Sequence, residues 1–65
     1  MADFEIRMLN DTEVGISALT ERAQKERRNP PGHTLAFKSP SDARPYVTAA
    51  EREGFTFKGK ELLGL

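Results

Sequence analysis

The stretch DARPYVTAAEREGFTFKGKEL, residues 42–62, carries the clearest secondary-structure signal of the chain. Tyr46, Val47 and Ala50 recur at the spacing that places side chains on one face of an α-helix. The positions between them carry mostly arginine, threonine and glutamate, which can face water. We therefore predict an amphipathic helix over residues 42–53.

A glycine follows the predicted helix and marks its end. Gly54 can take the left-handed backbone conformation that closes helices without steric cost, so we expect it at positive φ. Phe55 and Phe57 alternate, as they would in a short strand over residues 54–58. We expect Phe55 to fold back into the core and Phe57 to be partly exposed.

The same stretch resembles a known domain. The shared pattern consists of Asp42, Ala43, Tyr46, Val47, Ala50, Gly54, Phe55, Phe57, Glu61 and Leu62. This pattern resembles the end of the nitrogen-fixation-type leader peptide domain, found in precursors of ribosomally made, post-translationally modified peptides. The resemblance covers the C-terminal third of the chain and implies that this segment is held by a maturation enzyme.

The resemblance carries further expectations, some of which the chain does not follow. In that family the Gly-Phe-x-Phe segment leads into a further short helix, here through Glu61 and Leu62, so both strand and helix remain open for it. The family is expected to be helical in its first half, where this chain has an alternating pattern and a Pro-Pro turn. The chain ends at Leu63-Gly64-Leu65 without a double-glycine cleavage site or a following core peptide. We therefore expect a stand-alone or truncated member if the chain belongs to the family.

Two elements are predicted upstream of the Pro-Pro turn. Residues 3–9, DFEIRML, alternate charged and apolar side chains, which is typical of a half-buried strand. Ile16, Leu19 and Ala23 then recur at helical spacing, after an Asp-Thr-Glu sequence suited to a helix start. These patterns predict a strand over residues 3–9 and a helix over residues 12–28.

A second strand is predicted between the turn and the helix of residues 42–53. Residues 33–38 alternate again, with Leu35 and Phe37 on one face. Ser39 and Asp42 stand in the relation of a capping box at the start of the following helix. The expected fold is a small single α+β domain, residues 1–65, with a sheet of two or three strands covered by helices. A mainly helical bundle is the alternative.

Composition narrows the classes of function. Ten acidic and ten basic side chains cancel, which removes the general electrostatic argument for binding nucleic acid or an anionic membrane. The chain has no cysteine, as is common in a reducing cytoplasm, and no apolar run long enough to cross a bilayer. We expect a cytoplasmic protein without a membrane partner.

The inventory of catalytic groups is sparse. His33 is the single histidine, and it follows a Pro-Gly sequence at a predicted strand edge, where a structural role is expected. No Gly-rich phosphate-binding motif or metal-ligand spacing occurs. We therefore expect no enzymatic activity, no cofactor and no metal.

The remaining hypothesis is a small protein-interaction module, either leader-like or an accessory or regulatory subunit of a larger enzyme or complex. An exposed edge of the strand 3–9 could extend the sheet of a partner, and a homo-oligomer is compatible with this mode. We expect deletion of residues 61–65 to weaken partner binding more than it lowers the melting temperature. The alternative is a small nucleic-acid-binding protein with a local basic patch. The candidate partner-binding residues are Phe57, Leu62, Leu63, Leu65, Arg27 and Arg28.

Overall fold

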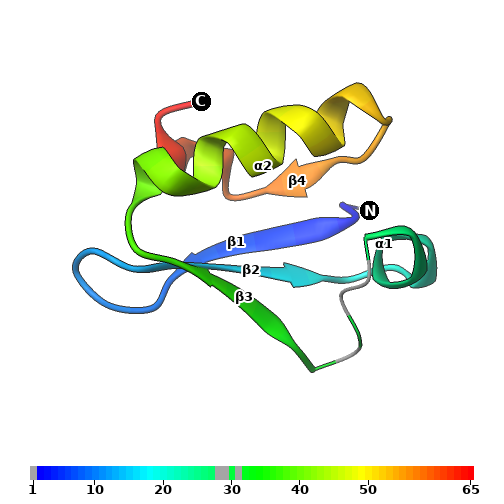
Figure 1. Cartoon of the computed structure of the whole chain (residues 1–65), viewed down its shortest axis with the longest axis horizontal. Coiled ribbons are helices and arrows are strands. Elements are labelled where there is room, and N and C mark those ends of the chain that lie inside the picture. The colour runs from blue at the N-terminus through cyan, green and yellow to red at the C-terminus, as the bar shows by residue number, and fades with distance from the viewer. Residues whose placement is uncertain (1, 28–29, 31) are drawn as a thin grey trace.

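A computed structural model describes residues 2–27, 30 and 32–65. The elements in chain order are β1 (Phe4–Met8), β2 (Val14–Ala18), α1 (Glu21–Glu26), β3 (Thr34–Phe37), α2 (Pro40–Arg52), β4 (Phe57–Lys58) and the 3-10 helix η1 (Lys60–Leu63). The α+β class is confirmed, because the described residues combine two α-helices with a sheet of four strands (Figure 1).

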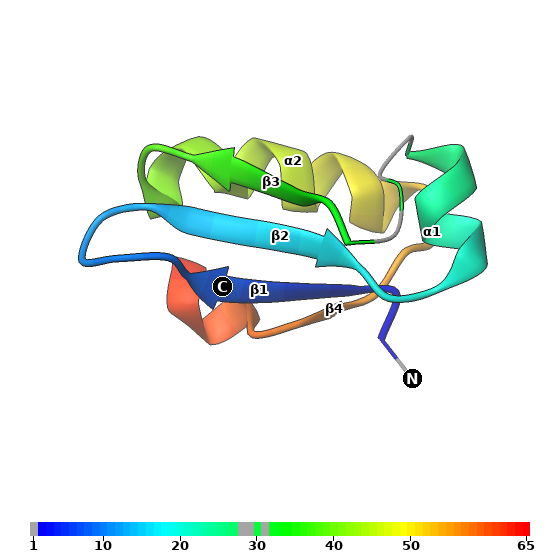
Figure 2. The same cartoon turned by 90° about the horizontal axis from the view of Figure 1, so that it is seen from below.

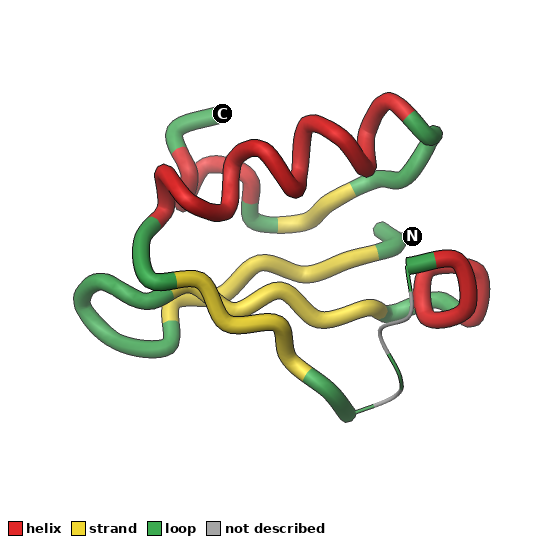
Figure 3. Tube along the Cα trace, viewed as in Figure 1, coloured by secondary structure: helices red, strands yellow, loops and turns green. Residues whose placement is uncertain are grey.

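The four strands form one mixed sheet in the order β3-β2-β1-β4. The pairs β1–β2 and β2–β3 are antiparallel, whereas β4 runs parallel to β1, as Figure 3 shows. Ile16 lies opposite both Ile6 and Leu35, so the apolar residues of neighbouring strands share one face. Helix α2 covers that face, while no described helix covers the opposite one (Figures 1 and 2).

The core lies between α2 and the sheet. Phe4 is completely buried, and its ring contacts the rings of Tyr46, Phe55 and Phe57 at centroid distances of 6.1, 5.5 and 4.8 Å. The buried apolar residues are Phe4, Ile6, Val14, Ile16, Ala23, Ala43, Val47, Ala50, Phe55 and Leu63. They come from β1, β2, α1, α2, the turn after α2 and η1, whereas no residue of β3 or β4 is fully buried.

The predicted helix over residues 12–28 is wrong. Residues 14–18 form β2, and the helix is confined to Glu21–Glu26. The Asp-Thr-Glu sequence belongs to a hairpin turn, because the side chain of Asn10 accepts hydrogen bonds from the backbone N–H groups of Thr12 and Glu13, at 2.9 and 2.8 Å. Thr20, not Asp11, caps the helix, since its hydroxyl accepts a hydrogen bond from the Ala23 N–H.

The competing periodicity explains this error. Val14, Ile16 and Ala18 fit a strand as well as the spacing of Ile16, Leu19 and Ala23 fits a helix. The strand prevails because pairing with β1 on one side and β3 on the other buries Val14 and Ile16 completely. A helix at this position would leave β1 without its antiparallel neighbour.

The predictions for the second half of the chain hold more closely. Strand β3 and helix α2 confirm the strand over 33–38 and the helix over 42–53, and Ser39 caps α2 by accepting a hydrogen bond from the Asp42 N–H. The helix starts earlier than predicted, at Pro40, and continues through Pro45. Beyond Gly54, both open alternatives occur in succession, since the two-residue strand β4 precedes η1.

Two glycines shape the connection from α2 to η1. Gly54 has a φ of +94°, as predicted, and the following Phe55 N–H donates to the Ala50 carbonyl at 3.1 Å. Gly59 has a φ of +93°, and a Cβ atom there would lie 2.6 Å from the Ile6 carbonyl oxygen. At Gly54 the nearest atom to such a Cβ is Nη2 at the end of the Arg22 side chain, at 3.4 Å.

We predict that Gly59→Ala destabilises the domain more than Gly54→Ala does. Both substitutions place an alanine in the left-handed region, at a cost of about 1–2 kcal/mol, but only Gly59→Ala also pushes a side chain against the backbone of β1. The free energies of unfolding are measured by urea titration monitored by circular dichroism. Equal losses for the two variants would show that β1 and the β4–η1 connection are not held as closely as described.

Candidate functional site

The candidate partner-binding residues occupy different environments. Leu63 is completely buried and packs in the core, so its assignment to an exposed surface is wrong. The Arg44 Nε group donates a 2.6 Å hydrogen bond to the Leu63 carbonyl and thereby fastens η1 to α2. The sequence does not indicate which of these leucines is buried, because three leucines within four residues show no helical or strand periodicity.

Leu62 and Leu65, which were predicted to bind a partner, are exposed. Their exposed fractions are 40% and 51%, and Met8, at the end of β1, is 38% exposed. Because β4 runs parallel to β1, η1 lies beside the C-terminal end of β1 (Figure 2). We call Met8, Leu62 and Leu65 the C-terminal apolar surface. Met8 was missed because β4 is too short for its pairing to be recognised in the sequence.

Phe57 is partly exposed, as predicted, but it also supports the core. Its ring stacks on Phe4 with an interplanar angle of 13° and meets Tyr46 edge-on at 6.5 Å. Its strand, β4, is an edge of the sheet, so one side of the residue remains accessible. Phe57 therefore adjoins a potential contact surface while it completes the aromatic cluster.

Arg27 directly follows α1, which lies at the opposite end of the molecule from η1 (Figure 1). Its guanidinium sits over the Tyr46 ring, 4.8 Å from the centroid, and its Nη1 lies 2.6 Å from Glu53 Oε2. These contacts leave 19% of the side chain exposed. Arg27 thus joins the end of α1 to the end of α2 and is not part of the C-terminal apolar surface. Arg28 lies outside the described residues.

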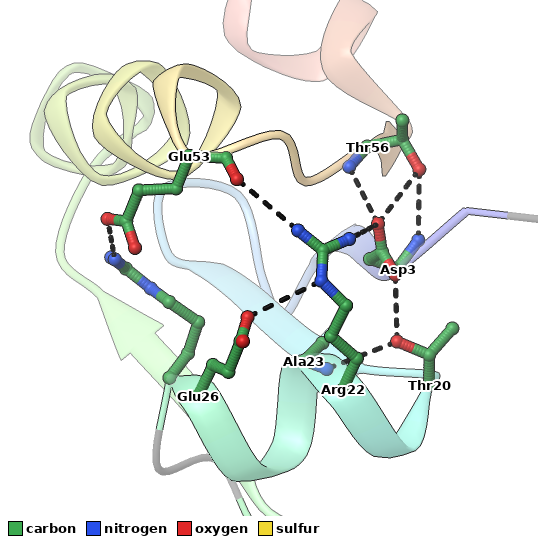
Figure 4. A network of polar contacts seen from close by, with 8 residues as sticks. Asp3, Thr20, Arg22, Ala23, Glu26, Glu53 and Thr56 are labelled. Carbon is green, nitrogen blue, oxygen red and sulfur yellow. Dashed lines mark hydrogen bonds and ion pairs between the residues drawn. The ribbon is translucent and has the colours of Figure 1, made fainter.

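A polar network that the sequence did not indicate surrounds Asp3 (Figure 4). Its carboxylate accepts hydrogen bonds from the Thr20 hydroxyl at 2.8 Å and from the Thr56 N–H at 3.0 Å, and Arg22 lies 3.8 Å away. Arg22 also contacts the Glu53 carbonyl and pairs with Glu26. The backbone hydrogen bond from Thr56, followed by that from the Thr20 hydroxyl, holds the pKa of Asp3 below its ordinary value.

This network has a structural role. The residue Asp3 precedes β1, Thr20 caps α1 and Thr56 precedes β4, so one carboxylate connects three segments that are distant in sequence. The Arg22 guanidinium connects the end of α2 to the same network, because it donates a hydrogen bond to the Glu53 carbonyl. It also lies over the Phe55 ring, 4.2 Å from the centroid. Each polar group is engaged within the fold, which leaves the network without a free group aimed at a ligand.

The predicted exposed edge at residues 3–9 is wrong. Strand β1 pairs with β2 on one side and with β4 on the other, so the edges of the sheet belong to β3 and β4. The parallel β1–β4 pair requires the crossover through α2, and the sequence does not show which strand a crossover returns to.

Several charged and aromatic residues that a nucleic-acid-binding patch could use are engaged within the fold. Arg27 is paired with Glu53, Lys60 with Glu51, and Phe55 is buried. In the described part of the chain we find no pocket and no group of three or more metal-ligating side chains. None of the helices described for this chain has the length and apolar character needed to span a membrane.

Comparison with known proteins adds no identification. Neither a family model, nor a curated protein, nor a solved structure matches this chain. The surfaces of the domain must therefore be interpreted from their own chemistry.

We predict that Leu63→Ala lowers the free energy of unfolding by about 2–5 kcal/mol, because it creates a cavity in the core, whereas Leu62→Ala changes it by less than about 0.5 kcal/mol. The two residues are adjacent, so each variant is the control for the other. Deletion of residues 61–65 is accordingly expected to lower the melting temperature markedly, in contrast to the expectation from sequence. Equal effects of the two alanine variants in urea titrations would contradict the burial of Leu63.

We predict that Asp3 stabilises the fold at neutral pH and loses this effect in acid. Its pKa is lower in the folded state than the ordinary value of 3.8, so its stabilisation is complete above that value and is lost as pH falls through the folded pKa. The difference in melting temperature between the wild type and Asp3→Asn should therefore shrink as the pH is lowered.

Asp11→Asn is the matched control for this prediction. Asp11 is exposed in the β1–β2 turn and makes no described hydrogen bond or ion pair. Its substitution should leave the melting temperature near that of the wild type throughout the pH series. A pH-independent loss for Asp3→Asn would show that the carboxylate acts through its shape and not through its charge.

Proposed function

We propose that the protein is a cytoplasmic, non-enzymatic interaction module that docks on a larger protein through the C-terminal apolar surface. The observation that carries this proposal is the fixed outward presentation of Leu62 and Leu65 on either side of the buried Leu63. The lack of cysteine in the sequence fits a reducing compartment.

The backbone around these leucines is held in place by contacts on both sides. Arg44 bonds to the Leu63 carbonyl, and Gly59 packs against the carbonyl of Ile6 in β1. The Leu65 N–H donates to the Lys60 carbonyl at 3.2 Å, which closes the turn after η1. A surface that is already ordered loses little conformational entropy when a partner binds, which favours its use as an anchor.

The composition around the apolar residues suits a protein interface. Apolar side chains at the centre of an interface are commonly bordered by polar ones. Here the exposed Glu61 and the Lys60–Glu51 pair, with a 2.6 Å contact, adjoin the two leucines. We expect the partner to present an apolar groove or patch with both charge signs at its rim.

The resemblance to leader peptide domains is consistent with this location. The similar segment, residues 42–62, corresponds to α2, β4 and the first part of η1, and it includes Leu62. A leader-like or accessory subunit would therefore use the end of the domain for recruitment. The class of partner that we propose is an enzyme that modifies a peptide or carries a regulatory subunit.

The test is site-specific photocrosslinking followed by reconstitution. A photoreactive amino acid at position 62 should give a crosslink to one host protein, whereas the same amino acid at position 48 should not, because Thr48 is exposed on the far side of α2. The crosslinked protein is then purified, and its affinity for this domain is measured by calorimetry. Leu62→Asp combined with Leu65→Asp should weaken that affinity by at least tenfold without lowering the melting temperature. Unchanged affinity in this double variant would refute the proposal.

A further inference from the structure

Strand β3 is an edge of the sheet, and among the described residues no strand pairs with its outer side. The Leu9 N–H donates to the Glu13 carbonyl, and the Leu19 N–H donates to the Asp3 carbonyl. Residues 13 and 19 flank β2, so the odd-numbered residues of β2 point their backbone N–H and C=O groups towards β1. Because these directions alternate along an antiparallel strand, the even-numbered residues of β2 bond to β3.

The register of β3 then identifies its free groups. Val14 pairs with Phe37 and Ile16 with Leu35, so these residues of β3 direct their N–H and C=O groups inwards to β2. Thr34 and Ala36 direct theirs outwards. No hydrogen bond described for this chain engages the outward backbone groups of Thr34 or Ala36. The edge therefore presents an unpaired row of donors and acceptors.

This edge lacks charged residues, prolines and bulges, which usually prevent an edge strand from pairing with another chain. Its four residues, Thr-Leu-Ala-Phe, include no charge and no proline, and they pair with β2 without a bulge. The other edge, β4, has only two residues, one of which is Lys58. The two edges of the same sheet thus differ in protection, and only β3 offers a strand long enough to pair.

Apolar groups line both faces of this edge. Leu35 and Phe37 are half-buried on the face that α2 covers. On the open face Ala36 is exposed beside Gly15, and the side chain of Leu9 lies over that glycine, 2.8 Å from where its Cβ would be. A strand added here would bury apolar surface above and below the sheet.

We propose that the occupant is β3 of a second copy, which pairs antiparallel and joins the two four-stranded sheets into one of eight strands. The two-fold axis passes through Ala36, so that Ala36 of one copy faces Ala36 of the other and each exchanges its outward N–H and C=O groups. In this register Leu35 lies opposite Phe37 of the second copy, and Thr34 lies opposite Lys38. Apolar side chains meet apolar ones, and no like charges face each other.

Self-pairing is favoured over the addition of an unrelated segment by this complementarity. The strand matches itself on both faces, and the chain carries no net charge that would repel a second copy. On the helix side, Arg44 and Glu51 mark the flank of α2 that faces η1. The flank towards β3 carries Tyr46, whose ring lies 5.7 Å from the ring of Phe37.

The dimer and the proposed docking function use separate surfaces. Strand β3 is at one edge of the sheet, whereas η1 contacts β1 and α2 near the other edge. A dimer would therefore present two C-terminal apolar surfaces and could bind two partner molecules.

The test is sedimentation velocity over a concentration series of the purified full chain. The wild type should sediment as a reversible monomer–dimer mixture that shifts towards dimer as concentration rises. Ala36→Pro removes the outward N–H, and Ala36→Lys places two charges side by side at the axis, so both should sediment as monomers at every concentration. Thr48→Lys adds the same charge on the outer side of α2 and should dimerise like the wild type.

A second measurement locates the interface and separates it from loss of fold. Amide hydrogen exchange at Ala36 and Thr34 should slow as the wild-type concentration rises, while exchange at Leu35 stays slow throughout. The melting temperature of Ala36→Lys should remain near that of the wild type under monomeric conditions.

The proposal is overturned if the wild type sediments as a monomer throughout, or if it forms a dimer that Ala36→Lys does not disrupt. The proposal is also overturned if the protein stays monomeric and the β3 amides are protected from hydrogen exchange only when a peptide of another protein is bound. None of these results bears on the crosslink at position 62, so the docking function stands or falls separately.

Discussion

The packing around the Phe4 ring is the interaction on which the rest of the structure depends. This ring is completely buried and is surrounded by Tyr46 from α2, Phe55 from the turn after α2 and Phe57 from β4. A chain of 65 residues has few large side chains with which to build a core, so the same ring must fix several elements. Because Phe4 lies on a central strand, it orients the helix above the sheet and the edge strand beside it.

The aromatic cluster also explains why two arginines lie where they do. Arg22 and Arg27 cover the rings of Phe55 and Tyr46 at 4.2 and 4.8 Å, and both reach Glu53 at the end of α2. Their charges are satisfied while their planar groups shield aromatic surface from water. Arg27, which the sequence indicated as a partner-binding residue, therefore covers part of the aromatic core.

The sequence predicted the elements whose signals are local. Strand β1, strand β3, the cap at Ser39 and the positive φ of Gly54 each depend on a few neighbouring residues, and each was correctly placed. Strand β2 was misassigned because Ile16 fits both periodicities, and the choice between them is made by the partners on either side. The pairing of β1 with β4 could not be predicted from two residues without a characteristic pattern.

The surfaces were harder to predict than the elements. Leu62, Leu63 and Leu65 were all expected to bind a partner, but only Leu62 and Leu65 are exposed. Leu63 between them is core, and its carbonyl accepts a hydrogen bond from Arg44 of α2. Burial within such a short segment depends on which neighbour lies beside it, and that is a tertiary property. The unprotected β3 edge could not be recognised until β1 was found to occupy the centre of the sheet.

The parallel pairing of β1 with β4 has a consequence for synthesis of the chain. The hairpin of β1 and β2 involves neighbouring residues and can form early, but the hydrogen bonds between Asp3 and Thr56 join residues that are 53 positions apart. The Phe57 ring can stack on the Phe4 ring only after Phe57 has left the ribosome and folded back onto β1. Since residues still inside the ribosomal exit tunnel cannot join a sheet, the nascent domain exposes its central strand until translation has passed η1. Completion of this fold therefore waits until β4 and η1 have left the tunnel, and the growing chain is most open to chaperones and to aggregation just before that point.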